Sequence, residues 1–411
     1  MRGHGVTLDA VRREQFPALA DKTFLDAACA SLAPRAAADA IIALLHDVQT
    51  YPERSATAFH IRLDETRDAT RPQAARLIGA SPEDIALIEN TSHGLTIAAA
   101  AIPLEPGDNI LVPDLEYLQV PLPWRQQPSA AAPEIRLVRH VGGTLPVEQF
   151  AAVADSRTRA VVMSSVQWSN GYRADLNAIG AFCRDRKAWF VVDAIQQLGA
   201  FPIDVGRTPI DILVTGGHKW LNAPFGAGFM YINPASRDRL RPPVAGYLSV
   251  SPPEGGWAEY FRTLAISPLQ PVTFTTHARR NDTGGTGNYP GMVGLAASIG
   301  IINRLRTDTI AAHIRCLTDG LLEGLSRLPV RTVTPPDPAC RSGIITFSLD
   351  DVAREAALIE RLLDERIMVS HRYTSGVGGV RVSCHFFNTM DDIARLLDAA
   401  GAWLTASSRA R

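Results

Sequence analysis

Short apolar runs alternate with helical stretches through the middle of this chain, and no other sequence feature restricts the fold as strongly. Helices are expected over 92–102 and 175–186. The apolar runs are IALIE (85–89), NILVP (109–113), EIRLV (135–139), RAVVMS (159–164), AWFVVD (188–193), DILVT (211–215) and GAGFMYI (226–232). Continuous apolar strands that alternate with helices are typical of a mostly parallel sheet covered on both faces, so we expect an α/β fold.

The alternation of predicted strands and helices stops at 234–290. This segment is rich in Pro, Gly and Thr and is expected to form loops over a site. Helical periodicity returns at 291–330, and a second α+β unit is then expected from strand, helix, strand and helix at 342–349, 352–366, 379–384 and 390–405. We therefore expect three parts: an N-terminal segment packed on one of two domains, a large domain and a smaller C-terminal α+β domain, over 1–22, 23–290 and 291–411.

Charge and composition exclude several classes of protein. Lys+Arg total 41 and Asp+Glu total 42, which argues against a nucleic-acid binder because such proteins carry a basic excess. No apolar run approaches the roughly 18–20 residues that span a bilayer, and the N-terminus lacks the apolar stretch of a secretory signal. The 5 cysteines are scattered without a CxxC pair, which argues against a disulfide framework and a metal site. We expect a cytoplasmic protein without nucleic-acid or membrane partners.

Lysine is scarce, so chemistry that needs an amine has few candidates. The chain holds only Lys22, Lys187 and Lys219. Lys219 follows a predicted strand and two glycines, and lysine is the residue of Schiff-base chemistry. Lys22 lies in a polar N-terminal segment, and Lys187 lies at a helix end where a solvated side chain is expected. Lys219 is therefore the favoured amine.

Polar residues follow other predicted strands at the sheet edge where ligands of α/β folds bind. The segment 90–94 opens a helix, and it suits either a phosphate cradle or an ordinary N-cap. Tyr117 could stack on a flat ring or pack on its own domain. Asp193 closes an apolar strand, where its carboxylate could pair with a cationic ring nitrogen or cap a helix.

The order of these features resembles the class V aminotransferase family of fold type I pyridoxal-phosphate (PLP) enzymes, from about residue 23 to 400. The most specific stretches are VVDAIQQLGAFPIDV (191–205), TGGHKWLNAPFGAGFMY (215–231) and VRVSCHFFNTMDDIARL (380–396). The chain is most similar to the isopenicillin N epimerase-like and cysteine desulfurase/selenocysteine lyase-like branches. The resemblance implies a large domain with a mostly parallel seven-stranded sheet and a smaller C-terminal α+β domain.

The resemblance also implies a role for individual residues around PLP. Lys219 would form the Schiff base and then act as the base at the substrate Cα, Asp193 would pair with the pyridinium nitrogen, and Tyr117 would stack on the ring. Near the ring hydroxyl would lie Gln167 and Gln196, and the phosphate would be held by Ser92, the His93 backbone and His218.

Substrate and partner contacts are implied in the same way. Arg381 would bind the substrate carboxylate, for which a two-pronged guanidinium is suited. The segment around Ala28 and Cys29 would line the substrate pocket. Gly285 and Thr286 match a segment that reaches the phosphate from the other subunit, so we expect a homodimer with its site at the subunit interface.

Two departures from the family pattern narrow the expected chemistry. Relatives commonly carry Ser or Asn where this chain has Gly216, so one phosphate contact would be lost or made by Thr215. Cysteine desulfurases keep a nucleophilic Cys on the loop that corresponds to 370–380, and this loop has none. Cys384 is expected in the core, and Cys29, although near the pocket, is expected to be a small buried hydrophobe. A persulfide-forming desulfurase is therefore disfavoured.

The leading hypothesis is β-elimination from a cysteine-derived amino acid, a C–S lyase reaction, which needs no protein thiol. The alternative is an amino-acid epimerase or aminotransferase, and an epimerase would need a second acid/base from Tyr117, His371 or Tyr373. A non-catalytic binding protein is disfavoured by the complete Lys219, Asp193 and Arg381 set. The side-chain pocket is expected from loops 246–290 and 370–380, whose candidates are Trp257, Tyr260, Phe261, Tyr289, His371 and Arg372, although these could equally pack on their own domain or on a dimer mate.

Overall fold

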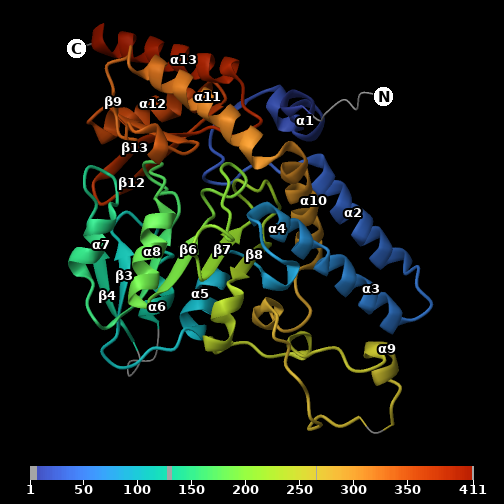
Figure 1. Ribbon diagram of the computed structural model, residues 1–411. Coiled ribbons are helices and arrows are strands. Elements are labelled where there is room, and N and C mark those ends of the chain that lie inside the picture. The colour runs from blue at the N-terminus through green and yellow to red at the C-terminus, as the bar shows by residue number, and fades with distance from the viewer. Residues whose placement is uncertain (1–6, 127–131, 265, 410–411) are drawn as a thin grey trace.

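A seven-stranded sheet forms the centre of the protein in the computed structural model, which describes residues 7–126, 132–264 and 266–409 (Figure 1). The strand order is β2-β8-β7-β6-β5-β3-β4. All neighbours in this sheet pair in parallel except β8, which runs antiparallel to both β2 and β7. Its strands are β2 (Ile85–Ile88), β3 (Asn109–Pro113), β4 (Glu134–Val138), β5 (Thr158–Ser164), β6 (Trp189–Asp193), β7 (Ile212–Gly216) and β8 (Gly228–Ile232). The predicted mostly parallel α/β fold is confirmed.

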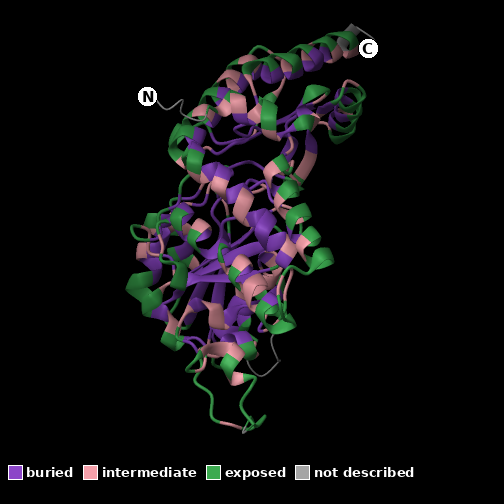
Figure 2. Cartoon of the chain, turned by 90° about the vertical axis from the view of Figure 1, so that its right-hand side faces the viewer, coloured by how far each residue is buried: buried purple, intermediate pink, exposed green. Residues whose placement is uncertain are grey.

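The central strands β5, β6 and β7 are almost entirely buried because both faces of the sheet are covered (Figure 2). Alternate residues of one strand enter different cores, as the side-chain period of two requires. Phe190 and Val192 join the core under α7 (Val147–Val153) and α8 (Leu176–Arg186). Trp189 and Val191 join the core under α5 (Thr91–Ala101) and α6 (Leu122–Arg125).

Helices that the sequence analysis did not name cover the β2 end of the sheet. They are α2 (Arg35–Thr50), α3 (Ala56–Asp68) and α4 (Thr70–Ile78). The long helix α10 (Tyr289–Leu305) packs against α2 and α4. The predicted loops of 234–290 are confirmed for the described residues up to 288, whose helices are the short α9 (Gly256–Tyr260) and 3-10 turns (Figure 1). That these loops lie over a site stays a prediction.

The C-terminal part contains a four-stranded antiparallel sheet in the order β12-β13-β10-β9. Its elements are β9 (Arg331–Thr332), β10 (Ile344–Ser348), β12 (Ser370–Thr374) and β13 (Val377–Ser383), with helices α11 (Thr307–Leu325), α12 (Val352–Asp364) and α13 (Met390–Arg409). The expectation of a loop at 370–380 was wrong, because β12 and β13 form a hairpin there. The cause is long-range: Glu355, which is buried on α12, receives hydrogen bonds from Tyr373 and pairs with His371.

The described part of the N-terminal segment is tied to this C-terminal part. In α1 (Leu8–Gln15) and the residues that follow, Arg12 donates from Nε to the carbonyl of Phe387 at 2.9 Å, and Phe16 packs against the Phe387 ring. Strand β1 (Thr23–Phe24) then pairs in parallel with β11 (Ile367–Met368). Residues 1–6 of the predicted segment and 410–411 of the predicted small domain lie outside the described residues. The domain boundary at 290 stays a prediction.

None of the helices in the described part of the chain is long and apolar enough to cross a membrane.

Candidate active site

The carboxyl ends of β5, β6 and β7 meet at one edge of the central sheet. Ser164 pairs with Asp193, and Asp193 pairs with Val214, so the strands end at the same level. The residues that follow these strands line a cavity together with parts of the N-terminal and C-terminal segments. Its lining is Ala28, Cys29, Asn90, Thr91, Ser92, Tyr117, Gln119, Ser164, Trp168, Asp193, Ile195, Gln196, His218, Lys219, Arg372 and Arg381.

Lys219 and Asp193 are the buried charges at the centre of this cavity. Burial lowers the pKa of Lys219 to about 8, against the opposing charge of Asp193 and with the added repulsion of Arg381. Burial raises the pKa of Asp193 to about 6, although the Ile195 N–H donates to its Oδ1 at 2.9 Å and Lys219 carries opposite charge. A lysine with a lowered pKa is an available nucleophile and base, and a carboxylate this deeply buried favours a cationic partner.

Helix α5 brings its N-terminus against the end of β7. Its Gly94 lies so near β7 that an added Cβ would stand 2.4 Å from Cγ1 of Val214. Thr91 accepts a hydrogen bond on its Oγ1 from the Gly216 N–H at 2.9 Å. The helix start therefore lines the same cavity as Lys219 through Thr91 and Ser92, and a helix N-terminus is suited to an anion.

Of the two alternatives left open for the segment 90–94, the N-cap is present and the phosphate cradle stays a prediction. Asn90 is the N-cap of α5, and its Oδ1 accepts from the His93 N–H at 2.9 Å. The His93 backbone N–H that was expected to hold phosphate is therefore already engaged, and His93 does not line the cavity. Ser92 does line it.

Thr215 does not replace the phosphate contact expected to be missing at Gly216. Its Oγ1 donates to the carbonyl of Gly216 at 3.1 Å, and its side chain is buried away from the cavity. A Cβ at Gly216 would lie 3.2 Å from Oγ1 of Thr91, so the Thr91 hydroxyl occupies that space. His218 stacks on Phe225 at 5.1 Å, and burial, followed by the charge of Lys219, lowers the pKa of His218 to about 4.

Tyr117 lines the cavity with 45% of its surface exposed, and it meets Trp168 edge to face. Trp168 was not predicted from the sequence, and the buried Glu116 was given no role there. The Ser164 N–H and the Gln167 Nε2 each donate to Glu116 at 2.7 Å. Burial nevertheless raises the pKa of Glu116 to about 7.

The two glutamines expected near the ring hydroxyl differ in placement. Gln167 lies outside the cavity lining, and its Nε2 is used by Glu116. Gln196 lines the cavity, but its Nε2 donates to the carbonyl of Ala28 at 3.1 Å and its Oε1 accepts from the Trp220 Nε1 at 2.8 Å. Gln196 thus joins Ala28 to Trp220, the residue after Lys219.

Arg381 lies in the cavity wall with 1% of its surface exposed. Its Nη2 donates to Oδ1 of Asp26 at 3.0 Å and to Oγ of Ser370 at 3.4 Å, and its Nη1 donates to the carbonyl of Trp168 at 3.0 Å. Its buried Nε has no hydrogen-bond partner among the described residues. Arg381 is therefore held rigidly and retains a free donor.

Cys29 is exposed in the cavity, so the expectation of a buried hydrophobe was wrong. It lies beside the guanidinium of Arg372, whose Nη2 donates to Sγ at 3.6 Å. The physical reason is the short turn after Asp26, where the Cys29 N–H donates to the Asp26 carbonyl at 3.0 Å and carries the side chain outward. Cys384 is buried, as expected.

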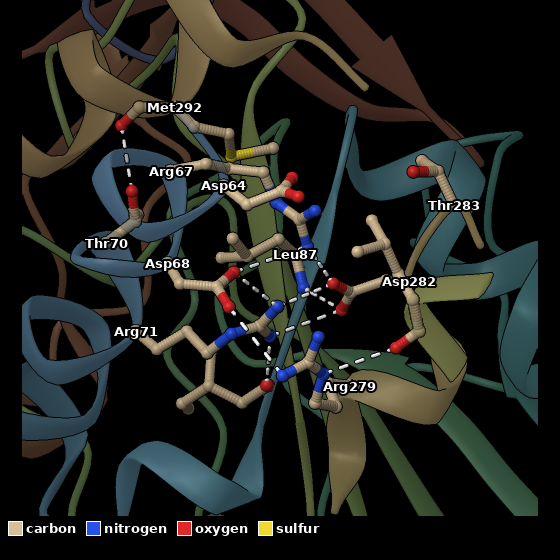
Figure 3. A network of polar contacts seen from close by, with 12 residues as sticks. Asp64, Arg67, Asp68, Thr70, Arg71, Leu87, Arg279, Asp282, Thr283 and Met292 are labelled. Carbon is tan, nitrogen blue, oxygen red and sulfur yellow. Dashed lines mark hydrogen bonds and ion pairs between the residues drawn. The ribbon is translucent and has the colours of Figure 1, made fainter. Parts of the chain in front are cut away.

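Gly285 and Thr286 are not brought to this cavity within one chain. The segment that leads to them is anchored by a buried ion network (Figure 3). Asp282 accepts from Arg67 and Arg71 and from the Leu87 N–H of β2, the last at 2.8 Å.

The aromatic residues expected to shape the pocket lie elsewhere. Trp257 and Phe261 line a separate cavity against α3, together with Tyr247 and His60. Tyr260 accepts from Gln270 on its hydroxyl, and Tyr289 donates from its hydroxyl to Asp64. No cluster of metal-ligating side chains occurs within the described ranges.

A family profile described as "Aminotransferase class-V" matches residues 23–396. The chain belongs to the class V aminotransferase family. It is accordingly a PLP-dependent enzyme.

Individual relatives of this class V enzyme are named for sulfur chemistry. A probable cysteine desulfurase from Methanothermobacter thermautotrophicus is 27% identical over 93% of this chain and 95% of its own length. A cysteine desulfurase from Salmonella gallinarum is 29% identical over 79% of this chain and 77% of its own.

Solved structures share the fold. The cystine C–S lyase C-DES, in complex with its product cysteine persulfide, superposes with a TM-score of 0.83 at 24% identity, over 94% of this chain and 99% of its own. The apo cysteine desulfurase from Thermococcus onnurineus superposes with a TM-score of 0.82 at 24% identity, over 96% of this chain and 98% of its own.

The cavity of the class V enzyme suits PLP on the chemistry of its own residues. A buried Asp193 carboxylate without an ion pair among the described residues favours a pyridinium nitrogen. The start of α5 suits a phosphate, and Lys219 is the amine beside both. Tyr117 offers an aromatic face at the cavity wall.

Proposed function

We propose that this enzyme is a C–S lyase that performs β-elimination on a cysteine-derived amino acid. The observation that carries the proposal is that Lys219, Asp193 and the rigid Arg381 line one cavity, where both charges act on the Lys219 amine. An amino acid whose carboxylate is bound by Arg381 would present its Cα to Lys219. The cystine C–S lyase and the cysteine desulfurases among the relatives support sulfur chemistry at such a site.

Each step of the proposed elimination is assigned to PLP or to a residue of the cavity. PLP, when bound, supplies an electron sink for the charge that develops at Cα. Arg381 would hold the α-carboxylate, with Asp26 and Ser370 fixing its guanidinium. Lys219, with a pKa of about 8, would take the Cα proton. The Cβ–S bond would then break with its electron pair leaving on sulfur, which takes up a proton and departs as a thiol. The released 2-aminoacrylate would tautomerise to an imine, and water would hydrolyse it to pyruvate and ammonia.

A cysteine desulfurase is the second candidate, and Cys29 is the observation that favours it. The thiol of Cys29 is exposed in the cavity beside Arg372, although no Cys is present in 370–380. In that reaction Cys29 would take the substrate sulfur as a persulfide and alanine would be released. The lyase is preferred because it needs no acceptor thiol and because Cys29 is not on the hairpin next to Arg381.

An epimerase receives less support from the arrangement. His371 and Tyr373, two candidates for a second acid/base, both bond to Glu355 behind the hairpin. Tyr117 is then the remaining candidate of the three, and no separate observation favours it. An aminotransferase shares every step up to removal of the Cα proton, so product analysis must separate it from the lyase.

A homodimer is part of the proposal. Gly285 and Thr286 lie away from their own cavity, as a segment that reaches a neighbouring phosphate would. The nearby exposed loop carries Phe261, Leu264 and Leu269 with 60%, 105% and 92% of their surfaces exposed. Such apolar exposure supports contact with a second copy of the chain.

Product analysis with S-substituted cysteines tests the lyase. We expect thiol, pyruvate and ammonia in equal amounts from the PLP-loaded enzyme, with all three lost in Lys219→Ala. Lys187→Ala is the matched control, since Lys187 is exposed at the end of α8, and it should retain activity. Transfer of the amino group to a keto acid in stoichiometric amounts would exclude the elimination.

A further inference from the structure

We infer that the pocket selects a substrate with a second anionic group on its side chain, and that Arg372 is the residue that binds it. The inference rests on the proposed function, because it names the substrate class of the same site.

The hairpin places Arg372 on the same face as the carboxylate-binding arginine. Ser370 on β12 pairs with Arg381 on β13, and the Ser370 hydroxyl touches the Arg381 guanidinium at 3.4 Å. Arg372 is two residues further along β12, so it shares the face of Ser370 at a spacing of roughly 7 Å. His371 and Tyr373 point to the other side, toward Glu355. An amino acid anchored at Arg381 would therefore extend its side chain toward Arg372.

Arg372 differs from Arg381 in how its charge is compensated. Arg381 forms an ion pair with Asp26. Arg372 donates only to uncharged groups, the carbonyl of His371 at 2.8 Å and Sγ of Cys29 at 3.6 Å. No carboxylate within the described ranges lies at ion-pair distance from it. It is half-buried in the cavity wall, and its charge also acts on Arg381.

An unpaired, half-buried guanidinium in the wall of a substrate pocket favours a substrate with an anionic side chain over one with a neutral side chain. A carboxylate can accept two parallel hydrogen bonds from it, whereas a neutral side chain of the same shape leaves its donors without a charged acceptor. Charged hydrogen bonds contribute about 1.5–3 kcal/mol, which corresponds to tenfold or more in an equilibrium constant. The predicted substrate class is thus an S-substituted cysteine whose substituent ends in a carboxylate.

A matched pair of probes tests the inference. S-carboxymethylcysteine and S-carbamoylmethylcysteine have the same shape and differ in the charge of the side-chain terminus. We would measure kcat/KM and the dissociation constant of both, the latter from the change in cofactor absorption, for the wild type and for Arg372→Gln, Arg372→Lys and Arg361→Gln. Arg361 is exposed on α12 and pairs with Glu365, so it controls for loss of surface charge.

We expect the wild type and Arg361→Gln to bind the acid about tenfold more tightly than the amide. Arg372→Gln should remove this preference, with the amide almost unaffected, and Arg372→Lys should retain part of it. The acid-to-amide ratio of each variant is compared with the same ratio of the wild type, so any difference between the two leaving groups cancels.

Three outcomes overturn the inference: no preference in the wild type, equal losses for acid and amide in Arg372→Gln, or no binding of either probe. Equal losses would instead assign Arg372 to the α-carboxylate. Failure of the proposed function is distinguishable, since an acid preference in binding without release of thiol and pyruvate would support the role of Arg372 and exclude the lyase.

Discussion

Replacing Asp193 with Asn should stabilise the cofactor-free protein at neutral pH. In the absence of a pyridinium partner, the folded protein holds a carboxylate of which 5% is exposed. Burial raises its pKa from an ordinary 3.8 to about 6, and the charge of Lys219 offsets this only in part. Asn keeps the oxygen that accepts from the Ile195 N–H and carries no charge. The variant therefore removes an unfavourable group without removing its hydrogen bond.

The magnitude follows from the two pKa values. At 1.36 kcal/mol for each tenfold change, the difference between 3.8 and about 6 amounts to about 3 kcal/mol. Because the folded pKa lies above the unfolded one, the penalty is complete above pH 6 and is relieved as the pH falls toward 4. Asp193→Asn should raise the free energy of unfolding by about 3 kcal/mol at pH 8 and by roughly half of that at pH 5.

Urea unfolding of the cofactor-free wild type and variant at several pH values is the assay. Asp155→Asn is a control for which the effect on the free energy of unfolding should have the opposite sign. Hydrogen bonds from Asn109 and Arg136 lower the pKa of Asp155 to about 2, so its stabilising effect is present above its ordinary pKa and is lost as the pH falls. An Asp193→Asn protein that is less stable than the wild type at pH 8, or whose difference does not change with pH, would refute the reasoning.

Three further perturbations follow from the same geometry. Glu116→Gln should remove an inflection near pH 7 from the profile of kcat/KM, because burial raises the pKa of Glu116 to about 7; an unchanged inflection would assign it elsewhere. Asp282→Asn should lower the free energy of unfolding by about 3–5 kcal/mol in urea, because it leaves the buried Arg67 and Arg71 with only the partly exposed Asp68 as a carboxylate partner; a loss below 1 kcal/mol would contradict this. Gly94→Ala should weaken PLP affinity in equilibrium dialysis, because the new Cβ would meet Val214 at 2.4 Å and push α5 away; unchanged affinity would show that the helix start is not the phosphate site.

The residues that the sequence placed correctly are those whose position depends on a strand end. Asp193 ends one apolar run that was predicted as a strand and Lys219 follows another, and parallel strands bring their carboxyl ends to one edge. The scarcity of lysine then left one plausible amine. The seven strands and the two cores of the central sheet follow from the same local pattern.

The residues that the sequence missed depend on contacts between distant segments. Cys29 is exposed because the turn after Asp26 directs it into a cavity built by other elements. Glu116 is buried through partners that lie 48 and 51 positions away along the chain. The hairpin at 370–380 was taken for a loop because its polar side chains are satisfied by Glu355 on α12. Glu116 could have been found from one signal in the sequence, because it is a polar residue just after a predicted strand.

The fate of substrate sulfur in Cys29→Ser tests the central claim most directly, because Cys29 is the one thiol that lines the described cavity. We would incubate the PLP-loaded wild type and variant with L-cysteine and with S-carboxymethylcysteine, and quantify pyruvate, alanine and protein-bound persulfide. A lyase should release equal pyruvate with both proteins and form neither alanine nor persulfide. Alanine formed with a persulfide on Cys29, and lost in Cys29→Ser, would contradict the lyase and make the enzyme a desulfurase.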